Sequence, residues 1–180
     1  MQSSPLLETC LDDLLGLSSK GPVLDLACGG GRNGLYLLSR GVPIVFADIR
    51  ADALEQISEA LAGQDPTSVE LWQVDLEDAG SSPLAGRLFS AIMVFRYLHR
   101  PLMPSIRDAI CPGGLLIYET FTVEQPNYGR PKNPDFLLQP GELLQCFGDW
   151  QVLHSFEGIE GSGKPGEKRA IAQIVARKPG

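Results

Sequence analysis

Apolar residues recur along the chain in a pattern that predicts alternating strands and helices. Short runs with little polar alternation, such as Ile44-Val45-Phe46 and 91–95, are typical of parallel strands that helices cover on both faces. Other segments carry apolar residues at every third or fourth position, as on the buried face of a helix. Strands are predicted over 22–28, 42–48, 69–75, 89–95, 114–121, 150–156 and 169–177, and helices over 5–17, 32–40, 51–62, 102–110 and 140–147. The pattern therefore predicts an α/β fold with an open sheet in a single domain, residues 1–180.

Two later segments depart from this alternation. Four prolines make a continuous helix or a central strand unfavourable over about 122–140. Because this segment follows the carboxyl end of a strand, where open α/β sheets bind ligands, we expect it to form a lid. The last two strands are joined by a glycine-rich turn, 158–166, without a helix, so they must run antiparallel. The helix at 5–17 could cover a ligand site or cap the sheet.

The first predicted strand contains Asp25 and runs into three consecutive glycines, 29–31. Glycines let the backbone approach a ligand closely, and the helix that follows points unpaired N–H groups at the same place. Gly29, Gly31 and Gly34 have the spacing of a dinucleotide-binding turn, and Asp48 ends the next strand, where a ribose-binding acid belongs. An NAD-dependent oxidoreductase is therefore one interpretation.

Other residues favour a cofactor with an amino-acid tail. The carboxylate of Asp25 would repel a pyrophosphate but attract an amine. Tyr128 and Lys132 have the spacing of a dehydrogenase pair, but the glycine and proline between them argue against a shared helix. Asp25 and the turn would face the tail, Asp48 the ribose hydroxyls, and Asp75, at the end of the third strand, an adenine amino group. The alternative is that these acids only cap the turns that follow them.

Five segments together resemble the class I S-adenosylmethionine-dependent methyltransferases. They are, in the order of that family, DLACGGGRN at 25–33, FADI at 46–49, VDL at 74–76, FSAIMV at 89–94 and CPGGLLI at 111–117. The resemblance implies a Rossmann-like, seven-stranded sheet of order 3-2-1-4-5-7-6 with the last strand antiparallel. Ala27 stands where the family commonly has its first glycine. The run at 29–33 resembles the tellurite-resistance and thiopurine-type branch, which methylates small soft nucleophiles.

The resemblance also implies the chemistry, which is in-line transfer of a methyl group from S-adenosylmethionine, with S-adenosylhomocysteine as the product. The cofactor contacts that it implies are Asp25, Ala27, Cys28, Gly29, Gly31, Asn33, Asp48, Ile49, Asp75, Leu76 and Phe95.

Candidate acceptor-side residues follow the fourth and fifth strands. His99 could act as a general base, Tyr97 could orient the acceptor and Arg96 could hold an anion. The alternative for His99 is a histidine that only hydrogen-bonds the backbone at a helix start. A carboxylate within a strand needs a partner, so Glu119 either pairs with Arg96 or Arg130 or faces the substrate.

The 122–140 segment adds two further substrate-side candidates, Tyr128 and Arg130. Its prolines would lower the entropy lost on ordering. The alternative is a surface loop that packs Tyr128 and Phe136 on the body of the protein.

Composition narrows the partners. A net charge of −7 argues against non-specific binding of nucleic acid and favours a small substrate. Local arginines and lysines at 96–132 could still form a basic mouth for an anionic substrate, or be scattered solvated cations. The four cysteines have wide spacings that indicate neither a metal site nor a disulfide framework.

Neither a signal peptide nor an apolar run long enough to span a bilayer is present, so the expected location is the cytoplasm. The leading hypothesis is a small-molecule methyltransferase. The alternatives are a methyltransferase acting on RNA or protein and a non-catalytic cofactor-binding module.

Overall fold

A seven-stranded sheet organises the computed structural model, which describes residues 3–62, 68–78, 80–161 and 167–180. Its strand order is β3-β2-β1-β4-β5-β7-β6, and β7 runs antiparallel to both of its neighbours while the other pairs are parallel. The strands are β1 (Val23–Leu26), β2 (Ile44–Asp48), β3 (Val69–Gln73), β4 (Phe89–Phe95), β5 (Ile110–Phe121), β6 (Gln151–Gly161) and β7 (Lys168–Arg177). The predicted sheet order and antiparallel ending are confirmed.

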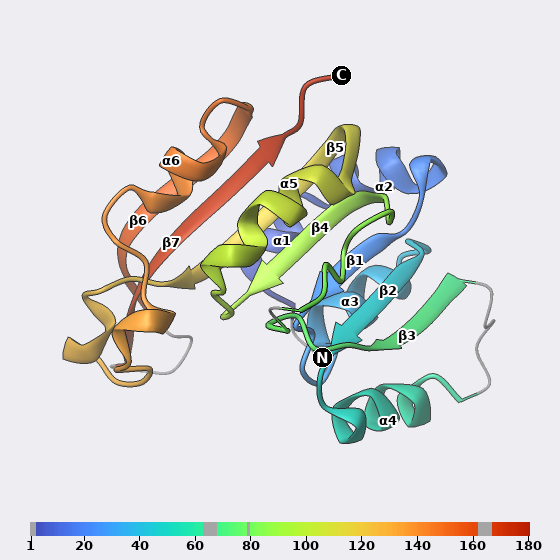
Figure 1. Ribbon diagram of the computed structural model, residues 1–180, viewed down its shortest axis with the longest axis horizontal. Coiled ribbons are helices and arrows are strands. Elements are labelled where there is room, and N and C mark those ends of the chain that lie inside the picture. Colours follow the sequence, from blue (N-terminus) through green and yellow to red (C-terminus); the bar gives the residue numbers. More distant parts are fainter. Residues whose placement is uncertain (1–2, 63–67, 79, 162–166) are drawn as a thin grey trace.

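Helices cover both faces of the sheet and create two separate apolar cores. They are α1 (Pro5–Thr9), α2 (Leu11–Leu17), α3 (Arg32–Leu38), α4 (Ala51–Ala60), α5 (Met103–Ala109) and α6 (Glu142–Phe147). The first four contribute to one core, through residues such as Leu14 and Ile57. Helices α5 and α6 contribute to the other, through Ile106 and Phe147. Figure 1 shows α5 and α6 on the near side of the sheet.

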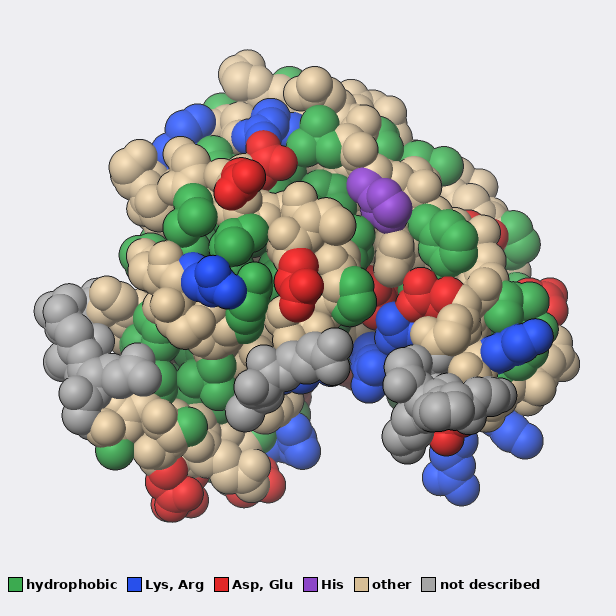
Figure 2. All heavy atoms as spheres, turned by 180° about the vertical axis from the view of Figure 1, so that it is seen from behind, with side chains coloured by type: hydrophobic (Ala, Val, Ile, Leu, Met, Phe, Trp, Pro, Cys, Tyr) green, Lys and Arg blue, Asp and Glu red, His purple; other side chains and the backbone are tan. Residues whose placement is uncertain are grey.

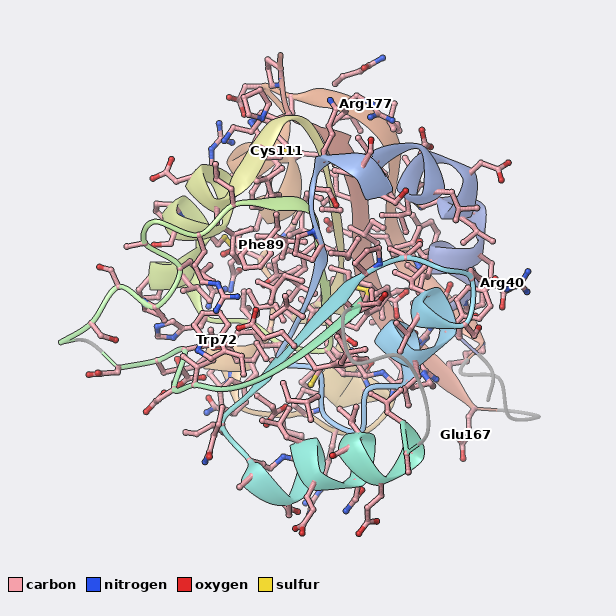
Figure 3. All side chains as sticks on the ribbon, turned by 90° about the vertical axis from the view of Figure 1, so that its right-hand side faces the viewer. Arg40, Trp72, Phe89, Cys111, Glu167 and Arg177 are labelled. Carbon is pink, nitrogen blue, oxygen red and sulfur yellow. The ribbon has the colours of Figure 1, made fainter. Side chains whose placement is uncertain are left out.

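Apolar side chains of the predicted strands lie between the sheet and the helices. Figure 3, turned by 90°, shows Phe89 inside the molecule, whereas Arg40 and Glu167 lie at its surface. No helix in the described part of the chain is both long enough and apolar enough to cross a membrane.

Several predicted boundaries are wrong. The strand expected over 114–121 already begins at Ile110, where the helix expected over 102–110 has ended. The single helix expected over 5–17 is two helices that meet at Cys10, where φ is −102° and ψ is 3°. The N–H of Cys10 bonds the carbonyl of Leu7 in a tighter turn, so the regular ladder is interrupted although both helices pack on the same core. Strand β6 extends to Gly161, into the predicted glycine turn, because pairing with β7 continues along this exposed edge strand. The rest of that turn, 162–166, lies outside the described residues.

The 122–140 segment has no continuous helix or strand, as predicted, and it is tied to the body at several points. It contains two 3₁₀ turns, η4 (Gln125–Asn127) and η5 (Pro134–Phe136). The buried Gln125 side chain accepts a hydrogen bond from the Ala170 N–H at 2.8 Å and donates to the Arg130 carbonyl at 3.0 Å. These contacts fix the base of the segment. That it closes over a ligand stays a prediction.

Candidate active site

The turn after β1 uses a backbone conformation that favours glycine. Residues 27, 29 and 31 all have positive φ, at 54°, 55° and 68°. A Cβ on Gly31 would lie 2.7 Å from the Ile57 side chain, so both the conformation and the space require glycine there. Ala27 holds its left-handed conformation with a methyl group, at a cost of roughly 1 kcal/mol. Ala27, which departs from the family pattern, therefore lies at a position whose backbone conformation favours glycine.

Asp48, at the end of β2, is fixed directly against this turn. It is buried, and its Oδ2 accepts a hydrogen bond from the Gly29 N–H at 2.7 Å. Its Oδ1 accepts from the Arg50 N–H at 3.0 Å. Each carboxylate oxygen has two lone pairs, so acceptor capacity is left for two hydroxyls. The geometry agrees with the expected ribose contact, which stays a prediction.

Asp25 lies beneath the turn and not in it. The side chain is buried, and its Oδ2 accepts a hydrogen bond from the Gly34 N–H at 3.0 Å. Burial raises the pKa of Asp25 to about 8, opposed by the Gly34 hydrogen bond and the charge of Arg32 and reinforced by Asp48. This carboxyl ties the start of α3 to β1. Its expected contact with an amine remains untested.

The remaining expected cofactor contacts border the same edge of the sheet. Asp75 is exposed after β3, and its Oδ1 accepts a hydrogen bond from the Glu77 N–H at 2.9 Å, which is the capping role considered as its alternative. Burial, followed by the charges of Asp25 and Asp48, raises the pKa of the Cys28 thiol, so the thiol stays neutral. Three other expected contacts differ in exposure: Leu76 is buried, Phe95 is half-buried and Ile49 is exposed.

Asn33 contacts the N-terminal segment, which the sequence pattern did not place in the site. Its Oδ1 accepts a hydrogen bond from the Ser4 N–H at 3.0 Å, and Ser3 and Ser4 are both buried. The chain before α1 thus lies against the first turn of α3, next to the glycines. Two ordinary serines carry no motif that could have shown this.

On the acceptor side, Arg96 has a left-handed backbone with φ of 58°, directly after β4. Its N–H donates to the Glu119 carbonyl at 2.8 Å, which ties the end of β4 to β5. Burial and the nearby charges of Arg169 and Arg32 lower the pKa of Arg96, while Glu119 opposes the shift. No ion pair or side-chain hydrogen bond of Arg96 occurs within the described ranges.

Glu119 does pair with an arginine, but the expected partners were wrong. Its Oε1 lies 3.2 Å from Nη1 of Arg169, and Gln173 donates to its Oε2 at 2.8 Å. Arg169 also pairs with Glu160 of β6. The antiparallel return of β7 brings the start of this strand beside the end of β5, a proximity that no local sequence pattern contains. Glu119 is 3% exposed, so both of its oxygens are enclosed with these donors.

The other acceptor-side candidates lie elsewhere. His99 lines a hollow of about 340 Å³ together with Leu76, Glu77 and Asp78, on the β3 side of the site. Tyr97 lies near Glu77 and Asp75, and burial followed by these two carboxylates raises its pKa. The candidates of the 122–140 segment, Tyr128 and Arg130, are exposed. Within the described residues, no side-chain hydrogen bond or ion pair joins any of these four to Arg96 or Glu119.

Two groups of polar side chains lie along one edge of the sheet. Backbone N–H groups, Asp48 and Asp75 follow β1 to β3, where the contacts with the cofactor are expected. Beyond β4, near Arg96, lies an ion-pair network in which Arg169 pairs with both Glu119 and Glu160. Acidic and basic side chains lie together around a hollow in the lower half of Figure 2. No cluster of three or more metal-binding side chains occurs in the described ranges.

Comparison with known proteins supports the same cofactor. A model of the methyltransferase domain family matches residues 23–114. The probable S-adenosyl-L-methionine-dependent methyltransferase TehB of Haemophilus influenzae is 27% identical over 177 residues, which cover 92% of this chain and 60% of that protein. Hemagglutinin 1 of Eikenella corrodens is 25% identical over 169 residues, covering 87% of this chain and 54% of that protein. The chain thus spans little more than half the length of these relatives.

Solved structures share the fold. The crystal structure of TehB from Haemophilus influenzae has a TM-score of 0.72 at 20% identity, covering 93% of this chain and 62% of that one. The N-methyltransferase NodS from Bradyrhizobium japonicum has a TM-score of 0.67 at 14% identity, with complete coverage of both chains. The glycopeptide N-methyltransferase MtfA, complexed with S-adenosyl-L-methionine, has a TM-score of 0.63 at 17% identity, covering 96% of this chain and 87% of that one.

Proposed function

The chain belongs to the methyltransferase domain family, with S-adenosylmethionine as the methyl donor, and from this premise we propose that it methylates a small molecule that carries an anionic group. One observation carries the proposal. Of the two neighbouring arginines on the acceptor side, Arg169 is neutralised by Glu119 and Glu160, whereas Arg96 has no carboxylate partner in the described ranges. An exposed guanidinium that lies beside like charges and has no carboxylate partner is stabilised by an anion.

The relatives support the small acceptor. NodS and MtfA are described as an N-methyltransferase and a glycopeptide N-methyltransferase, and both share this fold. The net charge of −7 opposes a nucleic-acid acceptor, whose binding would need a broad basic surface.

The proposed mechanism is alignment followed by in-line displacement. S-adenosylmethionine supplies a methyl group on a positively charged sulfur, which a nucleophile displaces. Asp48 and the glycine turn hold the cofactor, while Arg96 binds the anionic group and orients the nucleophile. Glu119 is enclosed with Arg169 and Gln173, so it positions the acceptor side and does not take the proton. A nucleophile that is already deprotonated needs no base, so this step does not require His99.

The test offers matched acceptors to the protein. Thiols, amines and hydroxyls are supplied in pairs, one member with a carboxylate and the other with a neutral amide, and formation of S-adenosylhomocysteine is measured. We expect turnover of the anionic member of at least one pair, and we expect Arg96→Gln to reduce its kcat/KM by roughly 10- to 100-fold, the value of one charge-assisted contact. Arg40→Gln, which removes an equal charge from an exposed helix end, is the matched control.

Equal turnover of charged and neutral members, or an unchanged preference in Arg96→Gln, would exclude the anionic acceptor. Methylation of RNA or protein substrates alone would replace the small-molecule acceptor.

A further inference from the structure

Two buried hydroxyls lack a hydrogen-bond partner. Among the described residues, Ser4 Oγ and Tyr97 Oη are the buried side-chain nitrogen or oxygen atoms without one. Buried polar groups in folded proteins are nearly always paired, because an unpaired one loses its hydrogen bonds to water without replacement. A buried hydroxyl without a partner in the chain is therefore a candidate to hydrogen-bond a bound ligand. Both of these hydroxyls lie beside the expected cofactor site.

Ser4 lies at the glycine-turn end of the site. It is 2% exposed, and its N–H donates to Asn33 in the first turn of α3. Its carbonyl accepts hydrogen bonds from Leu7 and Glu8, but its hydroxyl does not cap α1. The neighbouring Ser3 hydroxyl, in contrast, donates to the Glu8 carboxylate at 2.6 Å. The backbone of Ser4 is thus fully used while its hydroxyl is held in place without a partner.

Tyr97 lies at the other end, beside the residues that follow β3. Its carbonyl accepts a hydrogen bond from the Tyr118 hydroxyl at 3.0 Å, which fixes its backbone. Its own hydroxyl is enclosed near Glu77 and Asp75, without a hydrogen bond of ordinary length and angle to either. Asp75, the expected adenine contact, is one of the carboxylates near this hydroxyl, whereas Asn33, which holds Ser4, borders the glycine turn. The two orphaned hydroxyls therefore lie beside different parts of the expected cofactor site.

We propose that both hydroxyls are ligands of the cofactor: Ser4 of the amino-acid tail and Tyr97 of the adenosine end. A hydroxyl can donate one hydrogen bond and accept two, so either suits the carboxylate, amine and ring nitrogens of such a molecule. The N-terminal segment then belongs to the binding site, which explains why two serines before α1 are buried against Asn33. Tyr97 becomes a cofactor ligand instead of a residue that orients the acceptor.

Titration calorimetry with S-adenosylhomocysteine and with adenosine tests the proposal without requiring an acceptor. Ser4→Ala and Tyr97→Phe are each expected to raise the Kd of S-adenosylhomocysteine by roughly 3- to 10-fold, the value of one hydrogen bond. Tyr97→Phe should also weaken adenosine, whereas Ser4→Ala should leave it unchanged. Because neither hydroxyl has a partner in the free protein, the Tm of the cofactor-free variants should be unchanged or higher.

Ser90→Ala is the matched control. The Ser90 hydroxyl is equally buried, but it donates to the Pro22 carbonyl at 3.1 Å, near the opposite edge of the sheet. This variant should lower the Tm and leave the Kd of S-adenosylhomocysteine unchanged. An unchanged Kd in a folded Ser4→Ala or Tyr97→Phe variant overturns the assignment of that hydroxyl. A fall in Tm as large as that of Ser90→Ala would show that the hydroxyl has a partner within the protein, and would overturn it as well.

Discussion

Gly34, in the first turn of α3, offers the sharpest test of how closely the site is packed. A Cβ at this position would lie 2.3 Å from Cε1 of Phe46 and 2.8 Å from Oδ2 of Asp25. Phe46 is fully buried in the middle of β2 and cannot swing aside. Overpacking of this kind costs about 1–3 kcal/mol, while alanine in a helix recovers about 0.5–1 kcal/mol relative to glycine. The net effect expected of Gly34→Ala is a loss of about 1–2 kcal/mol of stability.

Gly16→Ala makes the same substitution in α2 with the opposite outcome. Nothing lies within 4 Å of a Cβ placed there, so only the helical preference counts and stability should rise by about 0.5–1 kcal/mol. In a chain of this length 1 kcal/mol corresponds to about 2–4 °C in Tm, so the two variants should differ by at least about 3 °C. Urea denaturation and thermal unfolding measure the difference. Equal stability of the two variants would refute the packing argument, since the helical term is common to both.

Three further perturbations test the charged groups of the site. Asp48→Ala should weaken S-adenosylhomocysteine by more than tenfold in a calorimetric titration while the protein stays folded; an unchanged Kd would mean that the ribose contact is wrong. Glu119→Gln leaves Arg169 with Glu160 alone, so urea denaturation should show a loss near the lower end of the roughly 3–5 kcal/mol typical of a broken buried pair, and no loss would contradict the buried ion pair. The pKa of Asp25 is raised from 3.8 to about 8, so between these pH values the folded protein keeps a proton that the unfolded chain releases. The stability that this group contributes is complete below pH 4 and is lost as the pH rises toward 8. If the free energy of unfolding of the wild type falls with pH no more steeply than that of Asp25→Asn, this reasoning is wrong.

The parts of this molecule that follow from local sequence are those in which backbone conformation dictates residue type. The glycines after β1 can be recognised in the sequence because positive φ and close neighbours disfavour other residue types there. The acids at 48 and 75 are visible because strand ends of a parallel sheet converge on one edge. The antiparallel ending is visible because two strands without a helix between them leave no room for a crossover.

The parts that were missed depend on contacts between distant segments. Arg169 pairs with Glu119 only because β7 returns beside β5, and Ser4 reaches Asn33 only because α1 packs over the sheet. Tyr97 and His99 follow Arg96 closely in sequence, yet they lie against residues of the connection between β3 and β4. The left-handed backbone of Arg96 marks this change of direction, and nothing in the residue types around it predicts a positive φ.

That conformation also links Arg96 to the strands at the other end of the sheet. A left-handed arginine costs roughly 1 kcal/mol, and strain of this kind persists where the surroundings enforce it. Here the N–H of Arg96 donates to the backbone carbonyl of Glu119. The side chain of Glu119 in turn pairs with Arg169. Arg96 is fixed by the end of β4 and by its contact with β5, whereas Asp48 is fixed by β2 and by the turn after β1. Changes in the hairpin of β6 and β7 should therefore alter the choice of acceptor while the cofactor contacts of the first three strands remain as they are.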